Sequence, residues 1–304
     1  MSQTDTGGHG ATDRSDTGRV TLHTPEEHAA YQAMSDAEKQ AFLRREYEAR
    51  NPLDPYATSR DYNARELEID AIFRYLPDQP GRVLDLGCGN GYTLLSLAQR
   101  LGAGWDLQGV DFTPSLVQGA EALTAERADQ IRSVPTFTCA DAITHVAGIE
   151  DASIDVVVTE RFLQNLPTRD AQYRMITDIA RILVPRGRFL MCEGSQRGHR
   201  RLNELRVACG LEAIPDTSPE NVSSLRFDDD DVERHARSVG FRIEAVVAFP
   251  TYFAVSRVLH PMLVAPDRPR FDAPINDAAR RLQLALENEP VIGSNVLWVL
   301  ERAT

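Results

Sequence analysis

The chain has 304 residues, 42% of them hydrophobic, and carries 33 basic and 45 acidic side chains for a net charge of −12. This length accommodates one large α/β domain with added elements, or two small domains. So acidic a surface repels phosphate backbones, which disfavours nucleic acid as a partner. The four cysteines form no C-x-x-C pair, and no apolar run approaches the roughly 20 residues that span a bilayer. We therefore expect a cytoplasmic protein with no bound metal and no membrane partner.

The first 80 residues separate into a polar tail and a group of short helices. Residues 1–20 have almost no apolar side chains and are expected to form a disordered tail. The sequences TPEE at 24–27 and SDAE at 35–38 each place a hydroxyl cap three residues before a glutamate, which is typical of a helix start. One short helix is expected after each, and a third from about Asp61 to Tyr75. Residues 21–80 are thus interpreted as an N-terminal helical cap.

Strand and helix patterns alternate through the rest of the chain, residues 81–304. Strands are expected at 82–86, 106–112, 135–140, 154–159, 187–193, 241–248 and 295–301. Helical patterns occupy 91–102, 114–128, 169–184 and 229–239. Such an alternation predicts an α/β fold, a doubly wound, mostly parallel seven-stranded sheet with helices on both faces. The segment from Pro250 to about Gly293 separates the last two strands and is expected to be a helical insertion.

A glycine-rich turn follows the first expected strand, in the segment VLDLGCGNGYT at 83–93. Glycine has no Cβ, so the backbone can adopt positive φ and let a ligand approach it closely, and the next helix points free N–H groups at that place. A nicotinamide-binding turn reads G-x-G-x-x-G and would need glycine at position 92, which is Tyr92. A nicotinamide oxidoreductase is therefore disfavoured. The candidate cofactor-binding residues of this turn are Asp85, Gly87, Cys88, Gly89 and Gly91.

Further candidates follow the second and third strands, since ligands of open α/β sheets bind beyond the carboxyl ends of the strands. Asp111 and Phe112 end the second strand, and Asp111 lies twenty residues after Gly91. At this offset an acid can accept hydrogen bonds from ribose hydroxyls, although it could also cap the next helix. Asp141 and Ala142 follow the third strand, where Asp141 by itself would be a turn aspartate.

The end of the fourth strand carries Glu160, Arg161 and Asn165 within the segment TERFLQNLP at 159–167. In order and spacing, the four strand ends resemble those of class I S-adenosylmethionine (SAM)-dependent methyltransferases over residues 80–200. The resemblance implies a Rossmann-like domain with SAM as co-substrate. It further implies that Asp141 and the Ala142 N–H contact adenine, and that the segment 159–167 lies under the sulfonium and faces the acceptor.

The same resemblance leaves the roles of several residues open. Many family members that act on small molecules carry histidine near position 165, which is Asn165 here. Glu160 and Arg161 form a self-neutralising pair, or one of them contacts the substrate. The segment 159–167 is also similar to an uncharacterised bacterial branch that we associate with small-molecule or polysaccharide gene clusters, which specifies no substrate.

Two regions outside the strand ends are expected to build the acceptor pocket. Arg65, in the N-terminal cap, could pair with the methionine carboxylate of SAM through a bidentate bond, or could be an exposed helix arginine. Tyr252, Arg257 and His260 recur at helical spacing in the insertion. Arg257 and His260, at i and i+3, should share a helix face. That face could hold an anionic acceptor or could equally be helix packing.

The candidate catalytic residues are Glu160, Asn165 and His260, while His145 is expected to be a loop residue. None is an obligatory base, which favours an acceptor that is nucleophilic by itself. The leading hypothesis is methyl transfer from SAM to a small metabolite, which could be anionic, by a monomer or homodimer. Alternatives are cyclisation of SAM to azetidine-2-carboxylate with release of methylthioadenosine, and a non-catalytic SAM-binding scaffold.

Overall fold

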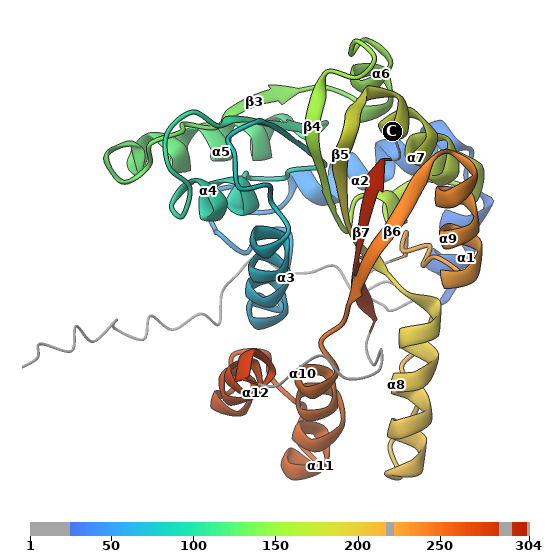
Figure 1. Ribbon diagram of the computed structural model, residues 1–304. Helices are drawn as coiled ribbons and strands as arrows, with labels where there is room; N and C mark the ends of the chain where they lie inside the picture. The colour runs from blue at the N-terminus through green and yellow to red at the C-terminus, as the bar shows by residue number, and fades with distance from the viewer. Residues whose placement is uncertain (1–24, 217–221, 286–293, 303–304) are drawn as a thin grey trace, which may run out of the picture.

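A computed structural model describes residues 25–216, 222–285 and 294–302, and the predicted disordered tail lies outside these ranges. Within them, seven strands form one sheet in the order β3-β2-β1-β4-β5-β7-β6 (Figure 1). Their bounds are β1 Arg82–Leu86, β2 Asp106–Asp111, β3 Thr136–Cys139, β4 Ile154–Glu160, β5 Leu183–Gly194, β6 Phe241–Val247 and β7 Asn295–Arg302. β1 to β5 pair in parallel, and β7 runs antiparallel to its neighbours β5 and β6. The predicted doubly wound, mostly parallel sheet is confirmed.

Helices cover both faces of this sheet. In chain order they are α1 Pro25–Ala33, α2 Asp36–Glu48, α3 Tyr62–Arg74, α4 Tyr92–Ala98, α5 Pro114–Glu126, α6 Ala142–Ala147, α7 Arg169–Ile182, α8 Gln196–Ala208, α9 Asp229–Ser238, α10 Pro250–Ala254, α11 His260–Val264 and α12 Pro274–Ala285. Short 3₁₀ turns occur as η1 at Ala128–Gln130 and η2 at Leu163–Asn165, and a π-helical turn, η3, spans Val255–Leu259.

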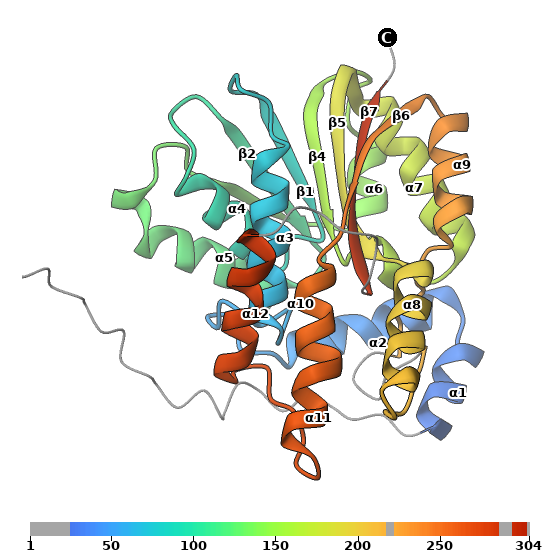
Figure 2. The ribbon, with the colours of Figure 1, turned by 60° about the horizontal axis from the view of Figure 1, so that its bottom comes forward.

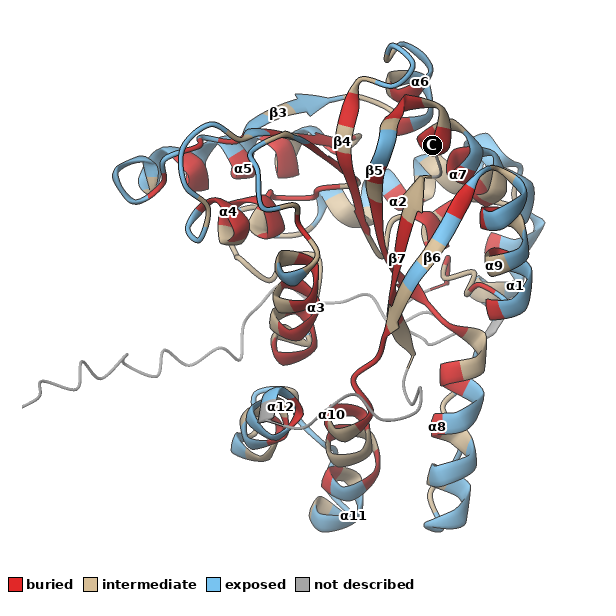
Figure 3. Cartoon of the chain, in the orientation of Figure 1, coloured by how far each residue is buried: buried red, intermediate tan, exposed pale blue. Residues whose placement is uncertain are grey.

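The core forms two layers because successive side chains of a buried strand point to opposite faces. In β4, Val156 and Val158 pack with α3, α4, α8, α10 and α12 on one face. Val157, between them, packs with α6, α7 and α9 on the other. Figure 3 shows the central strands buried along most of their length. The run of four consecutive buried residues in β4, Val156–Thr159, is typical of a parallel sheet covered on both faces.

Several helix starts follow the expected capping chemistry. The Ser35 side chain accepts from the Glu38 N–H while the Glu38 carboxylate accepts from Ser35, which is a complete capping box for α2. Asp61 caps α3 by accepting from the Ala64 N–H. Two bounds differ from expectation. α4 ends earlier than predicted. β5 begins at Leu183 rather than at 187, since the strand pairs with β4 on both sides of an irregularity where Arg186 takes a φ of 66°.

The order of the strands reverses between β1 and β4, which places a ligand crevice at the carboxyl ends of these two strands. Helices α8, α10, α11 and α12 extend beyond this edge (Figures 1 and 2). Of the helices between β6 and β7, α12 packs against α3 and α10 packs against α12. α2 passes beneath the carboxyl edge (Figure 2). None of the described helices is long and apolar enough to cross a membrane.

Candidate functional site

A first chamber opens at the carboxyl ends of β1, β2 and β4. The predicted cofactor residues on its wall are Arg65, Asp85, Gly87, Cys88, Gly89, Asp111, Phe112, Asp141, Ala142 and Glu160. Gly91 is not on the wall. It supports the turn from behind, since a Cβ there would lie 2.6 Å from the Phe137 ring and its φ is 72°. The structure thus brings residues from four separate strand ends and from α3 into one concave surface.

The glycine turn is built for close approach of a ligand to the backbone. Gly87 and Cys88 N–H groups both donate to the Val110 carbonyl, at 2.8 and 3.1 Å, which ties the turn to β2. Gly89 has a φ of 55°, and a Cβ added to it would lie 2.7 Å from Thr58 Cγ2. A side chain at this position would be strained and would also fill the chamber.

Asp111 links the glycine turn to the segment that follows β2. Its carboxylate accepts from the Gly89 N–H through Oδ2 and from the Thr113 N–H through Oδ1, both at 2.9 Å. Each carboxylate oxygen has a second lone pair, so hydroxyl groups of a ribose could still donate to it. Burial raises the pKa of Asp111, and the two backbone donors oppose that rise. A structural role and a ligand role therefore coexist in this side chain.

Asp85 is a buried acid at the end of β1, only 2% exposed. Burial raises its pKa to about 8, helped by the negative charge of Glu160 and opposed by Arg65. Among the hydrogen bonds of the described residues, none involves the Asp85 carboxyl group, yet the group faces the chamber. A cationic ligand would favour its ionised form.

Asp141 has the turn role that its position suggests and also lines the chamber. Its Oδ1 accepts from the Thr144 N–H at 2.9 Å and the Thr144 hydroxyl at 3.1 Å, which caps α6. Ala142 follows at the first position of that helix. The predicted adenine contacts are therefore presented by a fixed helix start. His145 lies in α6 rather than in a loop, outside the wall of the chamber.

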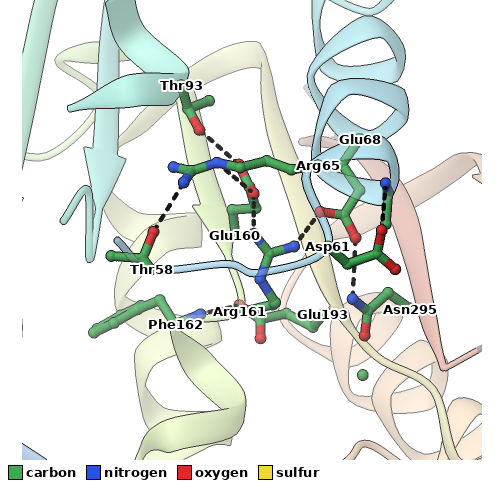
Figure 4. Close-up of polar contacts among 12 residues, drawn as sticks. Thr58, Asp61, Arg65, Glu68, Thr93, Glu160, Arg161, Phe162, Glu193 and Asn295 are labelled. Atoms are coloured by element: carbon green, nitrogen blue, oxygen red, sulfur yellow. Dashed lines mark hydrogen bonds and ion pairs between the residues drawn. The ribbon is translucent and has the colours of Figure 1, made fainter. Parts of the chain in front are cut away.

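Arg65 is 3% exposed, so the alternative of an exposed helix arginine is wrong. One guanidinium nitrogen donates to the Pro55 carbonyl at 3.2 Å and to Thr58 Oγ1 at 3.0 Å. Its Nε lies 3.6 Å from Glu160 and has no hydrogen-bond partner (Figure 4). A buried donor without a partner costs about 1–3 kcal/mol, so this nitrogen marks a place where a ligand acceptor is missing.

Glu160 and Arg161 form an ion pair within a larger buried cluster (Figure 4). Arg161 also pairs with Glu68 of α3, and the Thr93 hydroxyl donates to Glu160 Oε2 at 2.6 Å. Burial alone would raise the pKa of Glu160, but Arg161, Arg65 and the Thr93 hydroxyl bring it below its ordinary value. Glu160 therefore remains ionised and fully paired, which supports the self-neutralising pair rather than a general base.

Sequence reasoning missed two buried acids that hold this cluster in place. Glu68 is fully buried and accepts from Asn295 Nδ2 at 3.0 Å as well as from Arg161. Glu193, at the end of β5, accepts from the backbone N–H groups of residues 162–164 at 2.9–3.1 Å. Burial raises the pKa of Glu193 to about 7 against these donors. Their positions could have indicated a role at the site: Glu68 lies on the buried face of α3, and Glu193 lies at the end of a strand.

A second chamber, of about 260 Å³, adjoins the first. Its wall comes from α2, α3, the segment 59–61, residues 222–223, the insertion and the start of β7. The two chambers share the wall residues Leu43, Tyr47, Thr58, Arg161 and Asn165. We call these five residues the junction. Arg161 holds a φ of 56°, a strained conformation for a residue other than glycine, and such strain concentrates at functional sites.

The insertion contributes only one of its three predicted substrate residues to a chamber wall. Arg257 lines the second chamber, pairs with Asp61, and has the rings of Phe253 and Phe271 5.7 and 4.9 Å from its guanidinium carbon. Tyr252 is buried and donates to Asp61 from behind the wall.

His260 is 3% exposed and lies outside both walls, so the structure does not bring it to the site. The π-helical turn Val255–Leu259 precedes His260 and contains Arg257. Its i→i+5 hydrogen bonds change the rotation per residue, so the α-helical i, i+3 rule behind the expected shared face does not hold. The described residues contain no group of three or more His, Cys, Asp or Glu side chains that could hold a metal ion.

Comparison with known proteins agrees with this architecture. The chain is 30% identical over 145 residues to an uncharacterised 37.1 kDa transposon protein of Streptomyces fradiae, covering 46% of this chain and 37% of that protein. It is 34% identical over 152 residues to ribosomal RNA large subunit methyltransferase G of Streptomyces coelicolor, covering 47% and 38%. The aligned region thus spans well under half the length of these curated relatives.

Among solved structures, the [4+2]-cyclase SpnF superposes with a TM-score of 0.53 at 20% identity, covering 79% of this chain and 81% of that one. This likeness shows the fold alone. Residues 77–232, about half of the chain, match the family described as "Methyltransferase domain". This range contains the glycine turn, the three following strand ends and Glu193. The chain belongs to the methyltransferase domain family.

Proposed function

We propose that this protein transfers the methyl group of SAM to a small molecule and releases S-adenosylhomocysteine. The observation that carries the proposal is the pair of chambers that meet at the junction. The first has the glycine turn and acids that suit a nucleoside, and the second shares the five junction residues with it. A methyl group that passes between two ligands would cross at that place.

The residues of the first chamber suit SAM group by group. Arg65 Nε, which has no hydrogen-bond partner, would meet the methionine carboxylate, and Asp85 would face the cationic amino-acid end. Asp111 would accept from the ribose hydroxyls, while Asp141, Ala142 and Phe112 would border the adenine. Because Gly89 has no Cβ, the space between its backbone and Thr58 remains open for the ligand.

Methyl transfer from a sulfonium is an in-line displacement, so the protein's main contribution is to hold the two reactants in line. Correct placement alone can lower the barrier by up to roughly 7–11 kcal/mol. Here the Arg65–Glu160–Arg161–Glu68 chain of ion pairs fixes α3 to the end of β4 (Figure 4). The Glu193 carboxylate accepts from the Leu163 and Gln164 N–H groups and so fixes η2, which carries Asn165. Both supports hold the junction rigid.

The second chamber favours a small acceptor over a nucleic acid. Its volume of about 260 Å³ has room for a small molecule. The net charge of −12 also opposes binding of ribosomal RNA, the substrate named for one relative. We therefore propose a cytoplasmic enzyme that acts on a metabolite, with Arg161 and Arg257 on the acceptor side.

The decisive experiment is an inventory by mass spectrometry of what becomes of SAM. The protein is incubated with SAM alone, and then with the small-molecule fraction of its host. S-adenosylhomocysteine that appears only with the extract supports methyl transfer. Methylthioadenosine formed from SAM alone would indicate cyclisation or lysis and would overturn the proposal, and binding of SAM without any product would favour a scaffold.

A further inference from the structure

The junction contains a chain of hydrogen bonds that runs in one direction. Asn165 Nδ2 lies 2.7 Å from the Arg161 carbonyl, which can only accept, so the amide nitrogen must face that side. The same nitrogen donates to the Tyr47 hydroxyl oxygen at 3.3 Å. On the other side, the Ser223 hydroxyl donates to Asn165 Oδ1 at 2.8 Å. Both amide hydrogens of Asn165 are therefore used.

This direction determines what Tyr47 can offer to a ligand. Its oxygen already accepts from Asn165, and its own O–H donates to none of the protein groups in the described residues. The Tyr47 ring is held in place by the Arg50 guanidinium, whose carbon lies 4.3 Å from the ring centroid. Tyr47 thus presents a fixed hydrogen-bond donor on the wall that both chambers share.

The junction also lacks a group that could remove a proton from the acceptor. None of its five side chains is a carboxylate or an imidazole, and no histidine lies on either chamber wall within the described residues. Glu160, on the wall of the first chamber, is held by Arg161, Arg65 and Thr93. Asp61, on the wall of the second chamber, is held by Arg257 and Tyr252. A neutral alcohol, or an amine protonated at neutral pH, would need such a base to react well.

We propose that the acceptor presents a carboxylate oxygen at the junction, that Tyr47 holds this oxygen by donating its hydroxyl hydrogen, and that the product is a carboxyl methyl ester. The inference rests on the proposed methyl transfer. A carboxylate is already anionic at neutral pH, so it needs no base, and its oxygen can accept the hydrogen bond that Tyr47 donates.

The step balances without any proton transfer. A lone pair of the carboxylate oxygen forms the new O–CH₃ bond as the S–CH₃ bond breaks, and the bonding pair goes to sulfur. The negative charge of the carboxylate and the positive charge of the sulfonium disappear together. Because both reactants lose charge, a dry and pre-ordered junction favours the reaction. Tyr47 acts here by position and hydrogen bonding.

The chemical nature of the product tests the inference directly. The protein is incubated with SAM labelled in its methyl group and the small-molecule fraction of the host, and the labelled product is then treated with base. A carboxyl methyl ester releases volatile labelled methanol, whereas an ether or a methylamine keeps its label. Base-stable label would overturn this inference while the methyl transfer stands. Absence of labelled product would contradict the methyl transfer itself.

Tyr47→Phe tests the role of the hydroxyl. We expect the rate of label transfer to the extract to fall about 10- to 100-fold, the usual range for a lost hydrogen bond to a charged group. Tyr173→Phe is the matched control, because its hydroxyl is buried without a hydrogen-bond partner and lies outside both chambers. Equal rates in the two variants, with S-adenosylhomocysteine bound normally by both, would contradict the assignment of Tyr47.

The pH dependence of the wild-type protein gives a further check that needs no variant. At saturating SAM, the rate should not rise between pH 6 and 9, because neither the acceptor nor the junction must lose a proton. A tenfold rise per pH unit in this range would show that a proton is removed from the acceptor and would overturn the carboxylate assignment.

Discussion

The two chambers differ in how the chain builds them. The first is made of short segments that each follow a strand, and its residues lie where parallel strands end together at one edge of the sheet. The second is made of α2, α3, the insertion and the start of β7, which meet only through tertiary packing. A chamber built from strand ends is encoded locally, whereas a chamber built between added helices is encoded in how those helices pack. The class of cofactor is therefore easier to predict from the sequence than the acceptor.

The largest effect should come from disturbing the glycine turn that lines the first chamber. Gly89→Val should abolish SAM binding, because the new side chain would meet Thr58 and would be strained at a φ of 55°. Calorimetric titration with SAM measures the loss. Gly102→Val is the matched control, since no atom lies within 4 Å of a Cβ there. Normal SAM affinity in Gly89→Val would place the cofactor elsewhere.

A smaller and more selective effect is expected from Arg65→Met. Affinity for S-adenosylhomocysteine should fall by about 1.5–3 kcal/mol, the range for a hydrogen bond to a charged group, because its carboxylate loses the buried guanidinium. Affinity for methylthioadenosine, which has no carboxylate, should change little. Titrations of both ligands give the difference, and Arg74→Met, exposed at the end of the same helix, serves as control. Equal losses for the two ligands would refute the carboxylate contact.

The ligand-free protein should lose stability as pH rises, in part through Asp85. The folded-state pKa of Asp85 is raised to about 8, while the unfolded chain releases this proton near pH 4, so the folded state binds more protons between these values. Stability conferred by the neutral form is complete below about pH 4 and is lost through pH 8, at up to about 1.4 kcal/mol per pH unit.

Urea denaturation of the wild type and of Asp85→Asn at pH 5, 6, 7 and 8 measures this contribution. Glu193, whose pKa is raised to about 7, acts in the same direction in both proteins, so only the difference between the two curves is attributed to Asp85. Parallel curves would mean that Asp85 is ionised in the folded protein throughout this range.

The smallest effect on the first chamber is expected from a change in the second. Arg257→Gln should leave the affinity for S-adenosylhomocysteine unchanged, because Arg257 lines only the second chamber. The concentration of host extract that gives half-maximal label transfer should rise about 2- to 10-fold, as for one lost hydrogen bond. A loss of cofactor affinity in this variant would show that the two chambers are not separate.

Part of the site could be predicted because its determinants are close together in the chain. Asp85 and Gly89 belong to one turn, and the spacing to Asp111 is the length of a helix and a strand. Tyr47 and Glu68 could not be assigned in this way. A tyrosine and a glutamate on an N-terminal helix have many roles, and their distance from Asn165 and Arg161 depends on how α2 and α3 pack.

The sequence by itself determined the doubly wound sheet and the strand ends that line the first chamber, because alternating periodicity and glycine spacing act over a few residues. The tertiary structure alone decided that Arg65 is buried with one nitrogen that has no hydrogen-bond partner, and that His260 lies away from the chambers. It also decided that Tyr47 stands at their junction. These features depend on contacts between segments as far apart as α2, α3 and the insertion, and no local pattern specifies such contacts.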